Sequence, residues 1–374
     1  MNRLAELLNA YDPHKPLADA ATIPSGWYTD SSVADLERRA VFSAAWQMIG
    51  RVDDVREPGQ FITAEIAGEP VAVVRGRDGV LRGFFNVCRH HAAAVLTQAC
   101  GTASLLRCPY HGWTYTLEGA LKGAPEFEEV RGFERSDNGL VPLAIDTWEP
   151  FVFVRLDARG PTLADCVGDL APRVAKLNLP ELRFVARRAY EVGCNWKVYV
   201  DNYLDGGYHV PHAHKSLGSV LDYQAYSIEN GPRFCQQSSP IEPGGDAATA
   251  AVRGGRMAYY YWLYPNFMLN WYEGVMDTNL VVPRGVDRCE VVFDYYFAAA
   301  AAADESRIRQ SIAVSERVQE EDRLVCESVQ RGLRSRAYDV GRLSVRREAG
   351  EHLFHRLLHA DLTAGLRAED VIPW

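Results

Sequence analysis

Two short segments, Cys88-Arg-His90 and Cys108-Pro-Tyr-His111-Gly-Trp113, decide how the first half of this chain folds. Each segment pairs one cysteine with one histidine, and 17 residues separate the two pairs. Two loops of this kind can approach a bound metal group from opposite sides, each with one sulfur and one nitrogen ligand. Around them, residues 46–158 read as short strands broken by turns such as Arg77-Asp78-Gly79, which predicts a small antiparallel domain.

This division of ligands is typical of a Rieske [2Fe–2S] cluster. In such a cluster two thiolates bind one iron and two imidazoles bind the other, which raises the reduction potential to roughly −150 to +300 mV. A structural zinc site is the alternative, but zinc fingers pair cysteine with cysteine and histidine with histidine. We therefore predict a Rieske cluster, and its ligands are Cys88, His90, Cys108 and His111.

Residues 195–214 carry a second group of candidate ligands, which ends in His209-Val-Pro-His212-Ala-His214. Non-haem ferrous oxygenases hold iron with two histidines and one carboxylate on one face of the metal. A lone histidine is most often structural, but three histidines within six residues, beside a carboxylate, favour a metal site. His212 lies between His209 and His214 and competes with them as a ligand.

A later helix, which begins near Asp304, is expected to supply the carboxylate. Spacings of three and four residues place Asp322 on its apolar face, with Glu320 and Glu327 on the opposite face and Glu321 near the edge. An acid on an apolar face needs a metal or a cation, so Asp322 is either an iron ligand or part of a buried salt bridge with an arginine. The apolar stripe comprises Ile308, Ile312, Val318, Val325, Val329 and Leu333.

Three further histidines, His352, His355 and His359, share one helical face near the end of the chain. They could form a third metal site, but no carboxylate joins them at suitable spacing, although Asp361 is near. A face that packs or forms hydrogen bonds is the better interpretation.

Composition and charge are those of an ordinary globular protein, with 47% hydrophobic and 24% charged residues. The net charge of −9 provides no basic field for a nucleic acid. No stretch approaches about 18 consecutive apolar residues, and the N-terminus lacks a signal-peptide core, so we expect a cytoplasmic protein without a membrane span. The cysteines are scattered, which is not typical of a disulfide scaffold; apart from Cys88 and Cys108 they read as buried or neutral thiols.

The length of 374 residues suggests two domains. We expect residues 1–45 to form a helical segment that packs on the catalytic domain, residues 46–158 to form the cluster domain, and residues 159–374 to form the mononuclear-iron domain. The fold class is α+β, because strand patterns at 257–272 and 291–297 alternate with helical ones.

Residues 259–272 contain eight aromatic side chains. Alternate residues of a strand point to opposite faces, so about half of these rings can line one wall. Such a wall suits a flat aromatic substrate, or a quaternary ammonium group held by cation–π contacts, although several of the rings can simply form the core of a sheet. The candidates for a substrate cage are Tyr203, Trp262, Tyr264, Phe267 and Trp271.

The sequence resembles the alpha subunits of Rieske non-haem iron oxygenases, and within them the branch of choline monooxygenase, glycine betaine demethylase and carnitine monooxygenase. The resemblance extends from about Ile23 to His359, and one departure is His91-Ala92, where many members have Arg-Gly. Besides the cluster segments, the matching stretches are Asn202-Tyr-Leu-Asp-Gly-Gly-Tyr-His209-Val-Pro-His212, Tyr264-Pro-Asn-Phe-Met268, Met276-Asp-Thr-Asn279 and Cys326-Glu-Ser-Val-Gln-Arg-Gly-Leu333.

The resemblance implies a helix-grip-like catalytic domain in which His209, His214 and Asp322 hold the mononuclear iron. It also implies that Asp205, with Asn202 beside it, bridges an iron-ligating histidine and a cluster histidine of the neighbouring subunit. A carboxylate bonded to both rings orients them and couples their protonation to electron transfer. Because the two metal groups of one chain would lie too far apart, a cyclic oligomer is expected, most often a homotrimer. The alternative for Asp205 is an ordinary turn acid.

The cofactors implied are the [2Fe–2S] cluster, one Fe(II), O₂, and electrons from NAD(P)H through a separate flavin and iron–sulfur reductase. We therefore expect an oxygenase component that oxidises a carbon attached to a quaternary nitrogen. It would convert choline to betaine aldehyde hydrate, or remove an N-methyl group from a betaine as formaldehyde. A rival within the family is ring hydroxylation or O-demethylation of an aromatic acid. A rival from another class is a Rieske electron carrier without oxygenase activity.

Overall fold

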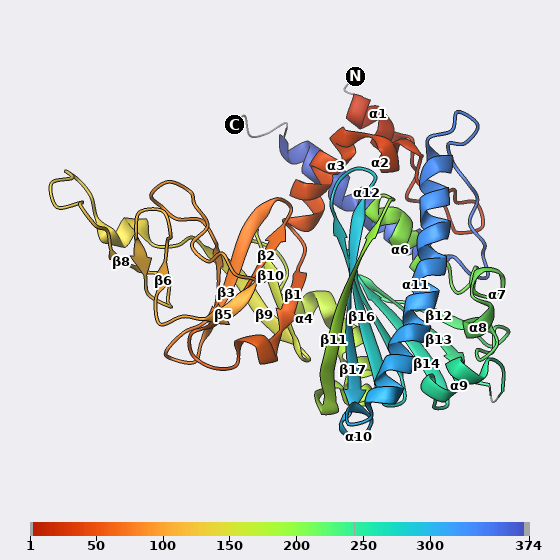
Figure 1. Cartoon of the computed structure of the whole chain (residues 1–374). Helices are drawn as coiled ribbons and strands as arrows, with labels where there is room; N and C mark the ends of the chain where they lie inside the picture. The colour runs from red at the N-terminus through yellow and green to blue at the C-terminus, as the bar shows by residue number, and fades with distance from the viewer. Residues whose placement is uncertain (1–2, 243, 370–374) are drawn as a thin grey trace. The chain divides into compact units, whose positions relative to one another are not determined.

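The computed structural model describes residues 3–242 and 244–369, and the chain forms two compact units. Unit 1 comprises Met1–Val41 and Cys166–Trp374, and unit 2 comprises Phe42–Asp165. These divisions lie a few residues from those expected after residues 45 and 158. The α+β fold class is confirmed, since both units contain antiparallel sheets and unit 1 adds long helices (Figure 1).

Unit 2 contains a seven-stranded antiparallel sheet in the order β1-β10-β9-β4-β3-β2-β5 and a smaller sheet in the order β6-β7-β8. Its central strands are rich in β-branched and aromatic residues, which suit a pleated surface that is buried. The elements of unit 2 are β1 (Gln47–Arg51), η2 (Val52–Val55), β2 (Gln60–Ile66), β3 (Glu69–Arg75), β4 (Leu81–Phe85), β5 (Cys100–Thr102), β6 (Leu106–Arg107), β7 (Thr114–Tyr115), β8 (Leu121–Gly123), η3 (Arg135–Asn138), β9 (Pro142–Trp148) and β10 (Phe151–Arg155).

The two ligand segments of unit 2 form the same tight loop. In each, the cysteine N–H donates to the carbonyl five residues later, at 2.9 Å for Cys88 and 2.8 Å for Cys108. The N–H four residues later donates back to the cysteine carbonyl, at 3.0 Å from Ala92 and 3.2 Å from Gly112. The residue that donates this second hydrogen bond has a left-handed backbone conformation in both loops, with φ of +58° at Ala92 and +75° at Gly112. The sequence departure at residue 92 therefore falls where glycine is favoured.

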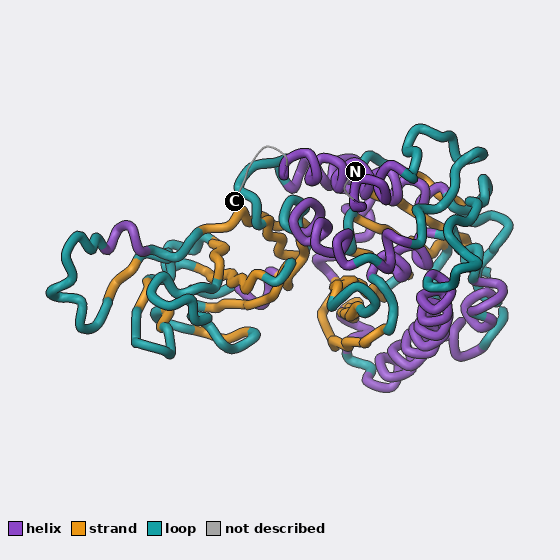
Figure 2. The backbone as a smooth tube through the Cα atoms, turned by 90° about the horizontal axis from the view of Figure 1, so that it is seen from above, coloured by secondary structure: helices purple, strands orange, loops and turns teal. Residues whose placement is uncertain are grey.

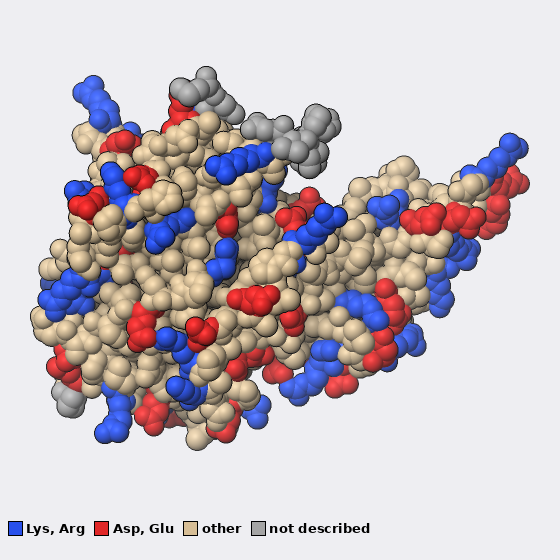
Figure 3. Space-filling view, turned by 180° about the vertical axis from the view of Figure 1, so that it is seen from behind, with Lys and Arg blue, Asp and Glu red and all other residues tan. Residues whose placement is uncertain are grey.

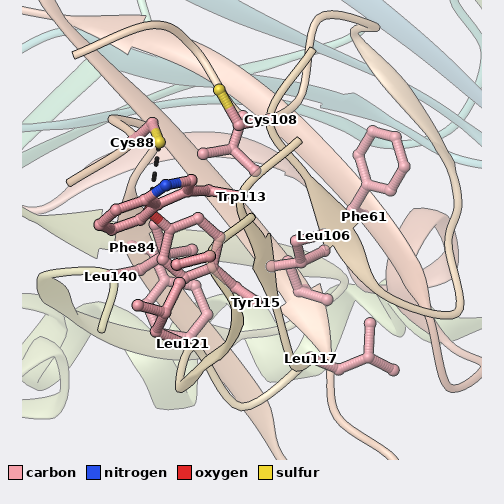
Figure 4. Packing of buried hydrophobic residues seen from close by; sticks show 13 residues of the cluster. Phe61, Phe84, Cys88, Leu106, Cys108, Trp113, Tyr115, Leu117, Leu121 and Leu140 are labelled. Atoms are coloured by element: carbon pink, nitrogen blue, oxygen red, sulfur yellow. Dashed lines mark hydrogen bonds between the residues drawn. The ribbon is translucent and has the colours of Figure 1, made fainter. Parts of the chain in front are cut away.

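A compact aromatic and aliphatic core lies under these loops (Figure 4). Trp113 and Tyr115 are fully buried in it, and the thiols of Cys88 and Cys108 lie at its edge. The Tyr115 hydroxyl lies 3.3 Å from Cys88 Sγ and accepts a hydrogen bond from the Arg89 N–H at 2.9 Å. The core thus fixes the sulfur side of both loops.

Unit 1 is built on a second seven-stranded antiparallel sheet, in the order β11-β17-β16-β15-β14-β13-β12. Consecutive strands pair antiparallel from β12 to β17, which makes this part of the sheet a meander. Its connections are short except between β13 and β14, where the chain forms helix α9. Its strands are β11 (Leu182–Val192), β12 (Ser227–Asn230), β13 (Phe234–Pro240), β14 (Met257–Leu263), β15 (Phe267–Tyr272), β16 (Val275–Pro283) and β17 (Cys289–Ala298).

The helices of unit 1 gather beside this sheet, as the perpendicular view of Figure 2 shows. The helix α6 contacts α11, α12 and strand β16, so it lies between the long helices and the sheet. Two helices, η1 (Arg38–Phe42) and α4 (Leu163–Val167), cross the boundaries between the units. The others are α1 (Arg3–Asn9), α2 (Gly26–Thr29), α3 (Ser31–Glu37), η4 (Gly168–Leu170), α5 (Ala171–Val174), η5 (Ala175–Leu177), η6 (Leu179–Glu181), α6 (Trp196–Leu204), α7 (Val210–Ala213), α8 (Lys215–Gly218), α9 (Ala247–Val252), α10 (Ala299–Ala302), α11 (Glu305–Leu333) and α12 (Ala349–Glu369).

The inner face of α11 is more polar than the stripe expected from the sequence. Val325 and Val329 are 37% and 44% exposed, so their assignment to the apolar stripe was wrong. Asp322 does face inward, but it shares that face with Gln319, whose Oε1 accepts a hydrogen bond from the Tyr199 hydroxyl. Polar side chains with specific partners can be buried, which a hydrophobic pattern does not reveal.

Charge is evenly mixed on the face drawn in Figure 3, where basic and acidic side chains are interspersed. None of the helices in the described part of the chain is long and apolar enough to cross a membrane.

The left-handed alanine yields a first prediction. Replacing Ala92 with glycine should stabilise unit 2 by about 0.5–1 kcal/mol. Glycine relieves about 1–2 kcal/mol of left-handed strain, and its greater freedom in the unfolded chain offsets about 0.5–1 kcal/mol of that gain. The measurement is the denaturant concentration at which the visible absorbance of the cluster is lost.

The matched control is Ala94→Gly in the same loop, where φ is not positive. There glycine only increases the freedom of the unfolded chain, so we expect a loss of about 0.5–1 kcal/mol. A lower midpoint for Ala92→Gly than for the parent would contradict the strain.

Candidate metal centres

The four predicted cluster ligands come together at one edge of unit 2. Cys88 and Cys108 are buried, and the imidazoles of His90 and His111 lie toward the surface with ring centroids 4.6 Å apart. Burial raises the pKa of the Cys108 thiol. His90 Nδ1 is buried and has no hydrogen-bond partner among the described residues, as expected of a ligand atom. Two sulfurs inside and two imidazoles outside fit a [2Fe–2S] cluster.

The second centre forms where α6 ends. Gly206 and Gly207 both have positive φ, of +68° and +67°, and a Cβ on Gly206 would lie 2.1 Å from the carbonyl oxygen of Arg347. Only glycine fits that approach, and the resulting turn brings His209 and His214 back beside the helix.

His209, His214 and Asp322 form a triad whose ligand atoms lie within 4.8 Å of one another. Asp322 Oδ1 is 3.0 Å from His214 Nε2 and 3.7 Å from His209 Nε2. The exposed His212, the competing candidate, is not part of this group. Two imidazole nitrogens and one carboxylate fit a mononuclear ferrous iron with open positions.

Carboxylates hold both triad imidazoles from behind. His209 Nδ1 lies 2.6 Å from Asp205 Oδ2, and His214 Nδ1 lies 2.7 Å from Glu321 Oε2. With Nδ1 engaged, each ring presents Nε2 to the centre, which is the usual arrangement of ligating histidines. Asn202 Nδ2 donates to Asp322 Oδ1 at 2.7 Å. Sequence reasoning placed Glu321 only near a helix edge, and its contact with His214 is set by the packing of α11.

Burial lowers the pKa of His214, but hydrogen bonds and charge from Asp322 and then Glu321 outweigh it, so that the pKa lies above its usual value. The two acids therefore favour positive charge at this imidazole, which in the absence of a metal is a bound proton. A divalent metal placed between the same acids would supply that charge directly.

A cavity of about 110 Å³ adjoins the triad, and both histidines and Asp322 form part of its wall. Several tyrosine hydroxyls of the wall form hydrogen bonds with other residues of the wall. Tyr203 donates to Asn270 at 2.8 Å, and the hydroxyl oxygens of Tyr260 and Tyr272 are 2.8 Å apart. The rings of these tyrosines line the cavity, and the guanidinium of Arg253 lies over one of them, 4.9 Å from the centroid of Tyr272. The aromatic residues of its wall are Tyr199, Tyr203, Tyr226, Tyr260, Tyr272 and Phe293.

A buried acid, Asp277, and a buried cationic side chain, Arg253, also belong to the cavity wall. Asn270 and Asn279 hold Asp277 Oδ2 at 2.7 and 3.3 Å, and burial raises the pKa of Asp277 while Arg253 opposes this rise. Arg253 donates to Ser311 at 2.8 Å. The segment Met276–Asn279 contributed to the family resemblance, but nothing in its sequence indicated that it lies at the site.

Of the predicted cage residues, only Tyr203 lines this cavity. Trp271 and Phe267 lie opposite Tyr259 and Leu263, on the other face of the sheet from Tyr260. Trp262 shares the face of Tyr260, but there helix α12 covers the sheet, and Trp262 and Tyr264 pack around Phe354. The prediction that these four rings line the substrate cavity is therefore corrected. The alternation of strand residues turns Trp271 and Phe267 away from the cavity, and helix α12 covers Trp262 and Tyr264.

The three late histidines do not share a metal geometry. His359 stacks on Trp27 with an interplanar angle of 15°, whereas His355 contacts Asp201. Within the described part of the chain, three potential ligand atoms converge at two places, the iron triad and the group of Asp201, Glu351 and His355.

Comparison with known proteins agrees with both centres. Residues 45–134 match the model of the Rieske [2Fe-2S] domain, and residues 179–364 match that of the ring hydroxylating alpha subunit catalytic domain. The chain is 41% identical to chloroplastic choline monooxygenase of Arabidopsis thaliana, over 96% of this chain and 87% of that protein. It is 31% identical to the carnitine monooxygenase oxygenase subunit of Escherichia coli strain K12, over 86% of each.

Solved structures agree as well. A quaternary ammonium Rieske monooxygenase in complex with L-carnitine superposes with a TM-score of 0.80 at 28% identity, over 92% of this chain and 95% of that one. Naphthalene 1,2-dioxygenase from Rhodococcus superposes with a TM-score of 0.81 at 20% identity, over 97% and 99% of the two chains, which shows a shared fold.

The acid behind His214 yields a second prediction. Glu321→Gln keeps a hydrogen-bond acceptor but removes its charge, so the imidazole becomes a weaker ligand and iron affinity should fall about 10-fold to 100-fold. The measurement is the mononuclear iron retained after dialysis against a ferrous chelator, with cluster absorbance as internal reference.

The matched control is Glu320→Gln, one residue earlier on α11, where the side chain is exposed and pairs with Arg323. It should retain iron as the parent does. Equal retention in the two variants would contradict a role for Glu321.

Proposed function

This chain belongs to the Rieske non-haem iron oxygenase alpha subunits, and we propose that it hydroxylates a carbon next to a quaternary ammonium nitrogen. Its cofactors are a Rieske [2Fe–2S] cluster and a mononuclear non-haem iron, with electrons supplied by a reductase. The alternative of an electron carrier is wrong, because the chain also contains the catalytic domain. Choline is the first candidate substrate, and a betaine that loses an N-methyl group is the second.

The single observation that carries this proposal is the tyrosine wall of the cavity beside the triad. Tyr203, Tyr226, Tyr260 and Tyr272 line this space, and Asp277 and Arg253 belong to the same wall. Aromatic faces attract a desolvated quaternary ammonium group by about 2 kcal/mol, and a quaternary nitrogen needs no hydrogen-bond acceptor. A bound quaternary ammonium group would stabilise the ionised form of Asp277, whose pKa burial otherwise raises. The guanidinium of Arg253 in the same wall is already bonded to Ser311, which leaves it less available to an aromatic acid.

The residues around the centre prepare it for the reaction. The mononuclear iron, when bound, supplies O₂ activation with electrons from the cluster. We assign to Asp205 and Glu321 the orientation of His209 and His214, and to Asn202 the orientation of Asp322. The tyrosine rings would exclude water and hold the ammonium group, so that a carbon attached to nitrogen faces the triad.

Turnover with a surrogate reductase tests the substrate. Choline, glycine betaine and carnitine are compared with a panel of aromatic acids, and product formation is measured together with O₂ consumption. We expect coupled turnover with at least one quaternary ammonium compound and none with the acids. Oxidation of the aromatic acids alone would replace this proposal with the rival one.

Two tyrosine variants give this test a structural control. Tyr260→Leu removes a ring of the cavity wall and should raise KM for the preferred substrate about 5-fold to 30-fold, which corresponds to about 1–2 kcal/mol. Tyr259→Leu changes the neighbouring ring on the other face of β14 and should leave KM unchanged.

The active assembly is proposed to be a homotrimer, in which Asp205 connects His209 to a cluster histidine of the neighbouring subunit. Exposed apolar residues support a subunit contact: Leu324, Val325 and Val329 on α11 are 55%, 37% and 44% exposed, and Tyr208 beside His209 is 47% exposed. One of the related solved structures is described in terms of inter-subunit electron transfer. Location in the cytoplasm is part of the proposal, although the plant relatives are chloroplastic.

Asp205→Ala is expected to separate metal binding from turnover. With ferrous iron added in excess, which saturates the mononuclear site even if loss of the bond to His209 weakens it, cluster absorbance and an iron content of about three per chain should survive. Coupled turnover should nevertheless fall by about 10-fold to 100-fold. The measurement is product formed per electron consumed.

Asp205→Glu, which keeps a carboxylate, is the conservative companion and should recover part of the turnover. Normal coupled turnover in Asp205→Ala would rule out the bridging role.

A further inference from the structure

A second group of converging ligand atoms lies in unit 1, outside the iron triad. It consists of Asp201 on α6 with Glu351 and His355 on α12. The sequence drew attention to His355 only as part of a histidine face, and the structure joins it instead to two acids. Nothing in the proposed oxygenase reaction uses this group.

Its distances are similar to those of the iron triad, but two carboxylates surround one imidazole here, whereas one carboxylate lies between two imidazoles there. Asp201 Oδ1 lies 3.0 Å from His355 Nε2, and Glu351 Oε1 lies 3.8 Å from the same nitrogen. The corresponding carboxylate-to-imidazole distances in the iron triad are 3.0 and 3.7 Å. All three ligand atoms are within 4.8 Å of one another in both groups.

Two of the three members of the group are buried, the Asp201 side chain is 17% exposed, and the group is short of positive charge. His355 and Glu351 are 0% and 7% exposed. Among the described residues, none donates a hydrogen bond to the Glu351 carboxylate, and Asp201 Oδ2 accepts one from the Tyr28 hydroxyl at 2.6 Å. The neighbouring Lys197 is held by Glu37 at 2.6 Å.

A buried acid, Glu351, and a partly buried one, Asp201, therefore face one imidazole. Burial and then the charge of Asp201 raise the pKa of Glu351, so a cation-free Glu351 would have to be neutral. A buried carboxylate without a partner is costly, and either a proton or a metal ion removes that cost.

We propose that Asp201 Oδ1, Glu351 Oε1 and His355 Nε2 bind a first-row divalent cation, at a site separate from the iron centre. One imidazole and two carboxylates suit Zn²⁺, Mn²⁺ or Fe²⁺, whereas a soft cation would need sulfur ligands. The Tyr28 hydrogen bond orients Asp201 so that its other oxygen faces the site, as outer partners of metal ligands do.

The bound cation connects α6 to α12. Asp201 lies one turn before Asp205 and next to Asn202, so the cation fixes the part of α6 that carries both side chains toward the triad. Its role is structural, and it goes beyond the proposed reaction without depending on the identity of the substrate.

Metal content of the holoenzyme tests the site. Parent protein and Glu351→Gln are incubated with Zn²⁺, desalted and analysed for zinc and iron by mass spectrometry, with acid-labile sulfide to count clusters. Glu348→Gln is the matched control. It makes the same change three residues earlier, just before α12, at a side chain that accepts the Ser344 N–H and is not one of the three proposed ligands. Crystals of the parent protein soaked with Mn²⁺ provide anomalous scattering from the site itself.

We expect the parent and Glu348→Gln to retain about one more equivalent of zinc per chain than Glu351→Gln, with equal iron and sulfide in all three. We also expect an anomalous peak between Asp201, Glu351 and His355. Equal zinc in the three proteins, or a soaked crystal without that peak, would overturn the proposal and leave Glu351 as a protonated acid. The crystal decides if Glu351→Gln does not fold, and neither result depends on turnover.

Discussion

The carboxylate of Asp322 is the contact on which the catalytic unit depends. Its Oδ1 lies 3.0 Å from His214 Nε2 and accepts a hydrogen bond from Asn202 at 2.7 Å, so it joins α11, α6 and the segment after α6. Asp205 and Glu321 fix the two imidazoles from their far sides. Because the rings are already oriented, metal binding does not have to order them, which is the physical meaning of a preorganised site.

This arrangement has a consequence for α11. Its inner face is given to polar contacts such as the one between Gln319 and Tyr199, because buried polar groups need partners. Apolar side chains at Leu324, Val325 and Val329 are then left on the outside of the same helix. A trimer contact of the kind proposed above would bury them. Helix α11 would then serve the metal centre with its inner face and the subunit contact with its outer face.

The cavity follows from sheet geometry in a similar way. Residue alternation sends Tyr260 and Tyr272 to the triad side of the sheet and Trp271 to the other side. Hydrogen bonds engage the hydroxyls of Tyr203, Tyr260 and Tyr272, which leaves their rings as the aromatic part of the wall. A surface of aromatic rings with a buried carboxyl group, in which the guanidinium of Arg253 is already bonded to Ser311, favours a cation that cannot itself donate a hydrogen bond.

The sequence by itself determined what lies close together along the chain. Both cluster loops and the pair of His209 and His214 were predictable, because each set falls within one or two short segments whose spacing reflects metal chemistry. The helix carrying Asp322 was predictable from periodicity, but not the polar character of its inner face. The contact of Glu321 with His214, the choice of ring faces in the cavity, and the group around His355 were decided only by tertiary structure. They join residues far apart in sequence, and helix and sheet packing alone sets which side chains face each other there.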